Sequence, residues 1–265
     1  RQRYLNARTL LAALQGWVKA NSQESAGPLA LFMDRLNSVG HLPSRASDMI
    51  DVHRLLTNES LRVDEIVDQL IRDPAMCWEL LKVTNTARYQ AGADESVTSL
   101  GRAIVLLGQT GLQRVCYGVR TWPGVLKAAE SLKDASSAAT AIDALSHEMK
   151  MACVVAFTAR WLRPFNVGDE EVMMAAMSQR LGRLLVLYHY PEESAQINRL
   201  MQPGPPPEPE GKPTPGMSYE AAVGAVLGIN PDELTAAVLK HWGLGDSIIQ
   251  ATKPYGQSSP HRPEN

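Results

Sequence analysis

The sequence has 265 residues, of which 45% are hydrophobic and 20% are charged, and its formal net charge is −2. These values are ordinary for a folded protein, so the chain is long enough to bury a core without metal or disulfide crosslinks. The balanced charge shows no basic excess, so we expect no nucleic-acid partner. No apolar run approaches the roughly 20 residues that cross a bilayer, and no signal peptide opens the chain, so we expect no membrane partner.

The three cysteines, Cys77, Cys116 and Cys153, are odd in number and widely spaced, and each lies in an apolar helical context. This pattern favours buried free thiols in a reducing cytosol over a disulfide framework, so we expect a cytoplasmic protein. The chain does not begin with Met and opens inside a helical pattern, and we therefore expect it to be an excerpt of a longer protein.

Apolar residues recur at helical spacing through the first half of the chain. The pattern predicts helices over residues 4–20, 28–40, 44–56, 63–71 and 74–86, with a linker over residues 21–28. Asp73 is a natural N-cap, and Pro74 stands at the first helical position, where its missing N–H does no harm. Ser99 and its neighbours open a further helix that Gly108 ends, followed by a partner helix over residues 110–121.

The middle of the chain carries its longest apolar patterns. Residues 126–132 suggest a short turn and residues 133–140 a linker, after which a long helix is predicted over residues 141–162. A second helix is predicted over residues 170–191, and it carries the largest number of apolar side chains on one face. We therefore expect it to be central and to pack beside the long helix. Gly168 and Asp169 supply its start, and Pro191 forbids its continuation.

The last part of the chain begins with a segment in which proline recurs at nearly every second or third position, residues 202–216. Such a segment is expected to form neither helix nor sheet, and we interpret it as an exposed loop, with a docking motif for a partner as the alternative. Helices are predicted over residues 219–227, 231–242 and 246–252. No stretch alternates with a period of two, so the sequence predicts an all-α fold without a sheet.

Several motifs, taken in chain order, resemble those of one family. The first set consists of Leu42-Pro43, Asp73-Pro74-Ala75, Leu80-Leu81-Lys82-Val83-Thr84-Asn85-Thr86, Val97-Thr98-Ser99-Leu100 and Leu107-Gly108. These look like the N-terminal half of HDOD domains. In the second half, Leu145-Ser146-His147-Glu148 with Ala152 looks like the family's Trp-x-His-Ser helix, and Trp242-Gly243-Leu244 resembles its closing motif.

HDOD domains are helical bacterial signalling and regulatory modules that are related to HD phosphohydrolases and are generally thought to lack catalytic activity. The resemblance covers residues 28–253 and implies two packed helical subdomains: an N-terminal one over residues 28–133 and an HD-like one over residues 134–253, which includes the Pro-rich loop. Residues 1–27 lie outside the match and are expected to belong to a connector from an upstream domain. Residues 254–265 are expected to form a disordered tail.

The resemblance also locates a candidate site. HD phosphohydrolases hold a divalent metal with a His, an adjacent His-Asp pair and a later Asp, and here the pair is replaced by Ser178 and Gln179. A hydroxyl and an amide are poor ligands for a hard cation, so we expect no catalytic residues, no bound metal and no cofactor. The remaining candidates for a vestigial pocket are His147, Ser178, Gln179, Arg180 and Arg183.

Two interpretations of these candidates stay open. Guanidinium groups suit phosphate, so Arg180 and Arg183 could bind a nucleotide or other small anion in the vestigial pocket. Alternatively, His147 is a satisfied residue on a largely apolar helix, and the arginines are the solvated side of an amphipathic one.

The expected function is accordingly a non-enzymatic module that binds a protein partner or a fused signalling domain. Ligand sensing is the alternative, and metal-dependent phosphohydrolase activity is a third hypothesis.

Overall fold

The fold is all-α, as the sequence predicts. The computed structural model describes residues 27–40, 42–57, 62–86, 96–122, 135–204 and 214–253. The first helices are α2 (Pro28–Val39), α3 (Ala46–Leu56), α4 (Val63–Leu70), α5 (Pro74–Thr84) and α7 (Leu100–Gly118). They are followed by α9 (Ala135–Leu162), α10 (Asp169–Ser178), α11 (Leu181–His189), α12 (Pro191–Met201), α13 (Tyr219–Leu227), α14 (Pro231–His241) and α15 (Asp246–Ala251).

Local capping explains where several helices begin. The Asp73 carboxylate accepts a hydrogen bond from the backbone N–H of Met76 at the start of α5, and Pro74 follows it. The Asn230 side chain accepts from the first N–H groups of α14 in the same way, and Gly228 ends α13 in a left-handed conformation with φ 66°. These helix starts and ends confirm the predictions. A cap depends on only a few neighbouring residues, so a short stretch of sequence is enough to predict it.

Three features differ from prediction. A two-residue parallel ladder, which no period-two pattern in the sequence indicates, joins β1 (Ser44–Arg45) to β2 (Thr121–Trp122), and α3 begins only at Ala46. The expected linker over residues 133–140 is helical from Ala135, where alanine-rich sequence favours helix. Gly108, with φ 61°, is non-helical and kinks α7 between two helical segments, which confirms the predicted break at this residue. At the Pro-rich loop, Gly204 and Thr214 pair in an isolated antiparallel bridge.

The predicted central helix over residues 170–191 is two helices. Gln179 and Arg180 form a turn between α10 and α11, and Tyr190 then separates α11 from α12. Gly182, near the start of α11, lies against α14, because a Cβ at this position would lie 2.6 Å from the backbone oxygen of Pro231. Glycine therefore lets α11 approach the backbone of α14 more closely than a residue with a side chain would allow.

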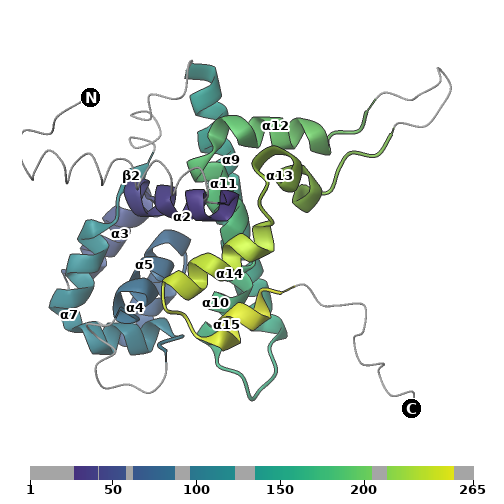
Figure 1. Cartoon of the computed structure of the whole chain (residues 1–265). Helices are drawn as coiled ribbons and strands as arrows, with labels where there is room; N and C mark the ends of the chain where they lie inside the picture. The colour runs from purple at the N-terminus through teal and green to yellow at the C-terminus, as the bar shows by residue number, and fades with distance from the viewer. Residues whose placement is uncertain are drawn as a thin grey trace, which may run out of the picture.

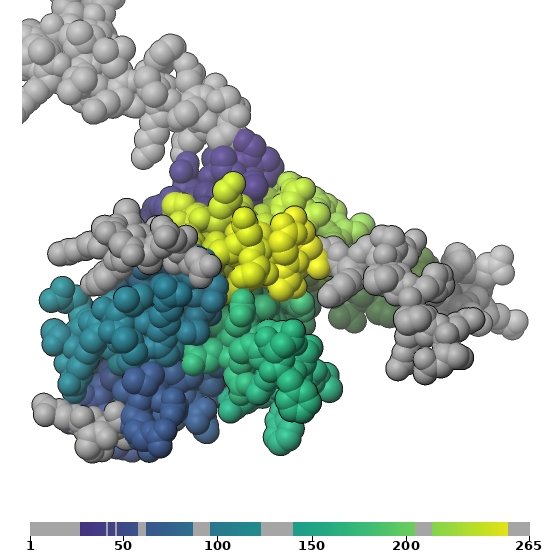
Figure 2. Space-filling model, turned by 90° about the horizontal axis from the view of Figure 1, so that it is seen from below, coloured from purple at the N-terminus to yellow at the C-terminus, as the bar shows by residue number. Residues whose placement is uncertain are grey.

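One buried hydrophobic cluster runs through both halves of the chain. Helix α9 packs along α10 and α11, as expected, and α5 packs on α7. Figures 1 and 2 show the blue and teal helices α3, α4, α5 and α7 on one side of the molecule, with the green and yellow helices on the other. The Phe32 ring of α2 lies 5.3 Å from the His189 ring and 5.5 Å from the Tyr190 ring, so α2 lies against the second half.

Several predicted features fall outside the described residues: the helix over residues 4–20, most of the following linker, the turn over residues 126–132 and the tail from residue 254. Among the helices that are described, none is by itself long and apolar enough to cross a membrane. The pair α13 and α14 reaches that length and apolarity only together, and the two helices are bent by 77°.

Candidate functional site

The candidate site lies where the α10–α11 turn meets α9. Ser178, the last residue of α10, is fully buried, and its Oγ accepts a hydrogen bond of 3.3 Å from the indole N–H of Trp78 on α5. Gln179 is exposed, and its amide donates to the backbone oxygen of Ala251 at the end of α15, at 3.0 Å. Both side chains therefore connect α10 to other helices of the fold.

A buried carboxylate lies beneath the two arginines. Glu148 on α9 is only 2% exposed; its Oε1 lies 2.6 Å from Nε of Arg180, and its Oε2 lies 3.0 Å from Nε of Arg183. A buried carboxylate without a counter-charge would be strongly destabilising, and the two guanidinium groups supply that counter-charge. This three-residue set, the Glu148 cluster, joins α9 to the α10–α11 turn.

Tyr219 at the start of α13 extends the Glu148 cluster. The guanidinium carbon of Arg183 lies 4.6 Å from the centre of the Tyr219 ring, which is a cation–π contact. Burial raises the pKa of the Tyr219 hydroxyl, and the nearby Arg183 charge opposes that rise. The hydroxyl has no hydrogen-bond partner within the described part of the chain.

A small cavity of about 150 Å³ opens beside the Glu148 cluster. Its polar lining comprises Gln179, Arg180, Arg183, Tyr219, Glu220, Asp232 and Thr235. Burial raises the pKa of Asp232, and the neighbouring Glu220 charge adds to the rise. With Glu148 behind the arginines, three carboxylates face two guanidinium groups, so the surroundings of the cavity are not net positive.

The structure brings only part of the predicted pocket together. Gln179, Arg180 and Arg183 line the cavity, whereas Ser178 and His147 do not. His147 is exposed on α9, and Glu148 is the residue of that pair that points inward. Within the described ranges, no group of three or more His, Cys, Asp or Glu side chains is placed to hold a metal ion.

Sequence reasoning singled out His147 and passed over Glu148, although a signal for Glu148 was present. Leu145, Ala152 and Ala156 of α9 are fully buried, and Met149 is 2% exposed. Glu148 lies three residues after Leu145 and four before Ala152, so helical periodicity places it on the same stripe. A carboxylate on an apolar stripe predicts a buried ion pair, and the arginines just after Ser178 were the available partners.

The cysteines are free thiols, as predicted, although Cys153 is only partly buried. Burial is the main cause that raises the pKa of Cys116 to about 12 and that of Cys153 to about 11, and it also raises the pKa of Cys77 well above the usual thiol value. These thiols stay protonated near neutral pH, so they lack the thiolate that nucleophilic or metal-binding cysteines require.

Comparison with known proteins identifies the family. The model of the HDOD domain family matches residues 42–257. The chain belongs to the HDOD family. A curated uncharacterized protein of Treponema pallidum (strain Nichols) is 29% identical to this HDOD chain over 90 residues. That match covers 34% of this chain and 17% of the relative, so most of the relative's length has no counterpart here.

Solved structures support the fold assignment. The MmoQ response regulator from Methylococcus capsulatus str. Bath is 17% identical, with a TM-score of 0.57 over 80% of this chain and 77% of that one. A virulence factor from Campylobacter jejuni subsp. jejuni is 18% identical, with a TM-score of 0.56 over 83% of this chain and 71% of that one. At these identities, the similarity establishes a shared fold.

Proposed function

We propose that this HDOD chain is a non-catalytic signalling module that acts by binding a protein partner or a fused signalling domain. The observation that carries the proposal concerns Ser178 and Gln179, which stand where the family resemblance places the metal-binding His-Asp pair. Ser178 accepts the Trp78 N–H and Gln179 donates to Ala251, so both side chains hold helices together. A metal site at this position would need ligands that these two side chains do not offer.

The surrounding charges support the same proposal. Glu148 is a buried carboxylate on α9, and both of its oxygens are already paired with arginines. Recruiting Glu148 to a metal would take from two partly buried guanidinium groups the carboxylate that pairs with both. The names of two structural neighbours, a response regulator and a virulence factor, are consistent with a regulatory role for the shared fold.

Enzymatic activity can be tested with the protein purified without chelators. We expect no stoichiometric metal by elemental analysis and no turnover of cyclic nucleotides when Mg²⁺ or Mn²⁺ is added. Stoichiometric metal together with turnover would overturn the non-catalytic part of the proposal.

The binding part of the proposal requires the full-length gene product. We expect affinity capture to retain a specific protein or to show a contact with a fused domain, and deletion of residues 28–253 to abolish that association. The captured protein must then bind the purified module directly. An unchanged set of captured proteins after the deletion would contradict a binding role.

A second candidate function is the binding of a small anion in the cavity beside Arg180 and Arg183, whose guanidinium groups suit phosphate. The cavity is smaller than the roughly 300–1,000 Å³ of typical ligand pockets, so inorganic phosphate is a more suitable probe than a nucleotide. A ligand that binds the folded state raises the melting temperature by mass action. A rise with phosphate at constant ionic strength that Arg183→Met removes would favour this candidate, and an equal response in both proteins would exclude it.

A further inference from the structure

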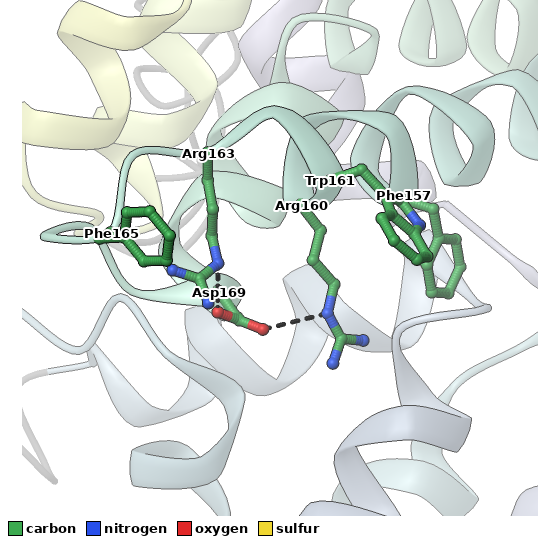
Figure 3. Close-up of a pocket in the computed structure, with 6 residues that line it drawn as sticks. All are labelled: Phe157, Arg160, Trp161, Arg163, Phe165 and Asp169. Atoms are coloured by element: carbon green, nitrogen blue, oxygen red, sulfur yellow. Dashed lines mark hydrogen bonds and ion pairs between the residues drawn. The ribbon is translucent and has the colours of Figure 1, made fainter.

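The C-terminal end of α9 and the connection to α10 form an open groove with aromatic walls (Figure 3). We name it the aromatic–arginine groove; its volume is about 610 Å³, and it is lined by Phe157, Arg160, Trp161, Arg163, Phe165 and Asp169. Trp161 is 87% exposed and Phe165 is fully exposed. Large aromatic side chains gathered in the open are typical of interaction sites.

The side chains divide the groove into walls and a floor. In Figure 3, the Phe157 and Trp161 rings lie side by side at one end, one helical turn apart, and Phe165 lies at the other end. Arg160 and Arg163 extend between them toward Asp169, which pairs with both. The groove thus offers aromatic faces on either side of a row of guanidinium donors.

The floor carries a net positive charge. Two guanidinium groups share the single carboxylate of Asp169, so the groove lining has a formal charge of +1. Asp68 of α4 lies 3.7 Å from Arg160 but outside the lining, and it is 64% exposed, so water screens its charge. A complementary ligand combines apolar rings that stack on aromatic faces with carboxylates that reach the arginines.

The chain itself carries a segment with this chemistry. Residues 205–213 read PPPEPEGKP, in which Glu208 and Glu210 alternate with prolines. Proline-rich segments bind grooves lined by aromatic side chains, because their restricted backbone loses little entropy on binding. The two glutamates would add charge-assisted contacts to Arg160 and Arg163.

The segment cannot reach the groove of its own copy. Gly204 and Thr214 at its two ends pair with an N–H to O distance of 2.9 Å, so residues 205–213 leave and return at one point. Such a loop reaches about 15 Å at most, half of its extended length. Figure 1 shows the two ends of the segment at the right, beyond the outer ends of α12 and α13, and the connection from α9 to α10 at the bottom of the molecule. Helix α9, with 28 residues, is about 42 Å long.

We propose that the aromatic–arginine groove of one copy of this protein binds residues 205–213 of a second copy. Reciprocal binding between two copies closes a dimer, and one-way binding adds copies in a row. A symmetric contact of groove on groove is disfavoured, since it opposes two positively charged floors. The assembly goes beyond the proposed signalling role and does not depend on which partner the module binds.

The first test is a titration of the protein with a synthetic peptide of residues 203–215, followed through the tryptophan indole N–H signals in an NMR spectrum. We expect the Trp161 signal, assigned with Trp161→Phe, to shift with a dissociation constant on the order of 0.1 mM, while the signal of buried Trp78 stays fixed. Trp161→Ala with Phe165→Ala should weaken binding about tenfold or more. Both side chains are exposed, so the fold should tolerate these changes.

Two controls distinguish the proposed contact from nonspecific binding. A peptide with Glu208→Lys and Glu210→Lys should bind at least about tenfold more weakly, because it opposes the arginines. Ile50→Ala and Val105→Ala remove other exposed hydrophobic side chains and should leave binding unchanged. Absence of a Trp161 shift at about 1 mM peptide, or equal binding of the charge-reversed peptide, would overturn the proposal.

The second test is sedimentation of the whole protein over a range of concentrations. We expect self-association that is lost in Trp161→Ala with Phe165→Ala and equally lost when Glu208 and Glu210 are both changed to Lys. A protein that stays monomeric at about 1 mM would overturn the proposal, and so would association that both variants retain. Neither result bears on catalysis or on capture of a signalling partner, so the proposed function stands or falls separately.

Discussion

Replacing Glu148 with Gln tests whether the Glu148 cluster holds α9 to the α10–α11 turn. The substitution keeps the size and shape of the side chain and removes its charge. Arg180 and Arg183, which are 30% and 34% exposed, then lose the carboxylate that lies within 3.0 Å of both. We therefore expect a destabilised but folded protein.

The magnitude follows from the burial of the three side chains. Removal of one member of a fully buried ion pair costs about 3–5 kcal/mol. Here the arginines are partly hydrated, which lowers the expected loss in free energy of unfolding to about 2–3 kcal/mol. For a chain of this size, such a loss corresponds to a fall in melting temperature of about 5–10 °C.

Urea unfolding of wild type and Glu148→Gln measures this loss, provided that the dependence of the free energy on urea is unchanged. His147→Gln, at the exposed neighbouring position, is the matched control and should change stability by less than about 0.5 kcal/mol. Phosphate at constant ionic strength should stabilise Glu148→Gln more than wild type, because the freed guanidinium groups accept an anion. Equal stability of Glu148→Gln and wild type would refute the structural role of the cluster.

Three further predictions concern other buried contacts. Asn85→Ala should lower the free energy of unfolding, measured in urea, by about 2–4 kcal/mol. The reason is that the Asn85 side-chain amide accepts from the Val97 N–H at 2.8 Å and donates to the Val97 backbone oxygen at 2.9 Å. A loss below about 0.5 kcal/mol would contradict this role. Gly182→Ala should lower the free energy of unfolding by about 1–3 kcal/mol in the same measurement, since its Cβ would lie 2.6 Å from a backbone oxygen of α14. The control is Gly224→Ala, whose Cβ would meet nothing within 4 Å and which should not destabilise the protein. Equal effects of the two substitutions would argue against the close approach. Burial raises the pKa of Asp73 to about 6, so ionisation of this carboxyl group opposes folding. The free energy of unfolding of wild type relative to Asp73→Asn should therefore rise by about 1 kcal/mol as the pH falls from about 7 to about 5. A difference that stays constant over this range would contradict the raised pKa.

The sequence predicted features of the fold that depend on neighbouring residues. Asp73 and Asn230 cap helices through hydrogen bonds to residues two or three positions later, so their role is visible in a short stretch of sequence. Ser99 caps α7 by the same local bond, and the break near Gly108 was also placed correctly. The all-α class followed from apolar spacing repeated along the chain.

The errors arose where distant residues decide the structure. The close approach of Gly182 to α14 involves residues about fifty positions later in the chain, so the local sequence does not show it. The ladder between β1 and β2 pairs two short segments that show no strand pattern of their own. In the candidate site, the arginines were identified but their partner Glu148 was not. The place of Glu148 on the apolar stripe of α9 is visible in the sequence, whereas its pairing with Arg180 and Arg183 depends on how α9 lies against the α10–α11 turn.

The position where the family resemblance places the HD pair links the two halves of the fold. Ser178 is fully buried, and its oxygen receives the Trp78 N–H across the two halves of the fold. Glu170, at the start of α10, accepts the Gly101 N–H at 2.8 Å across the same boundary. Helix α10 is thus fixed at both ends to the N-terminal helices, and a change at Ser178 acts on their packing before it acts on any ligand. This coupling is the property that a module needs if a partner bound on one half is to influence the other.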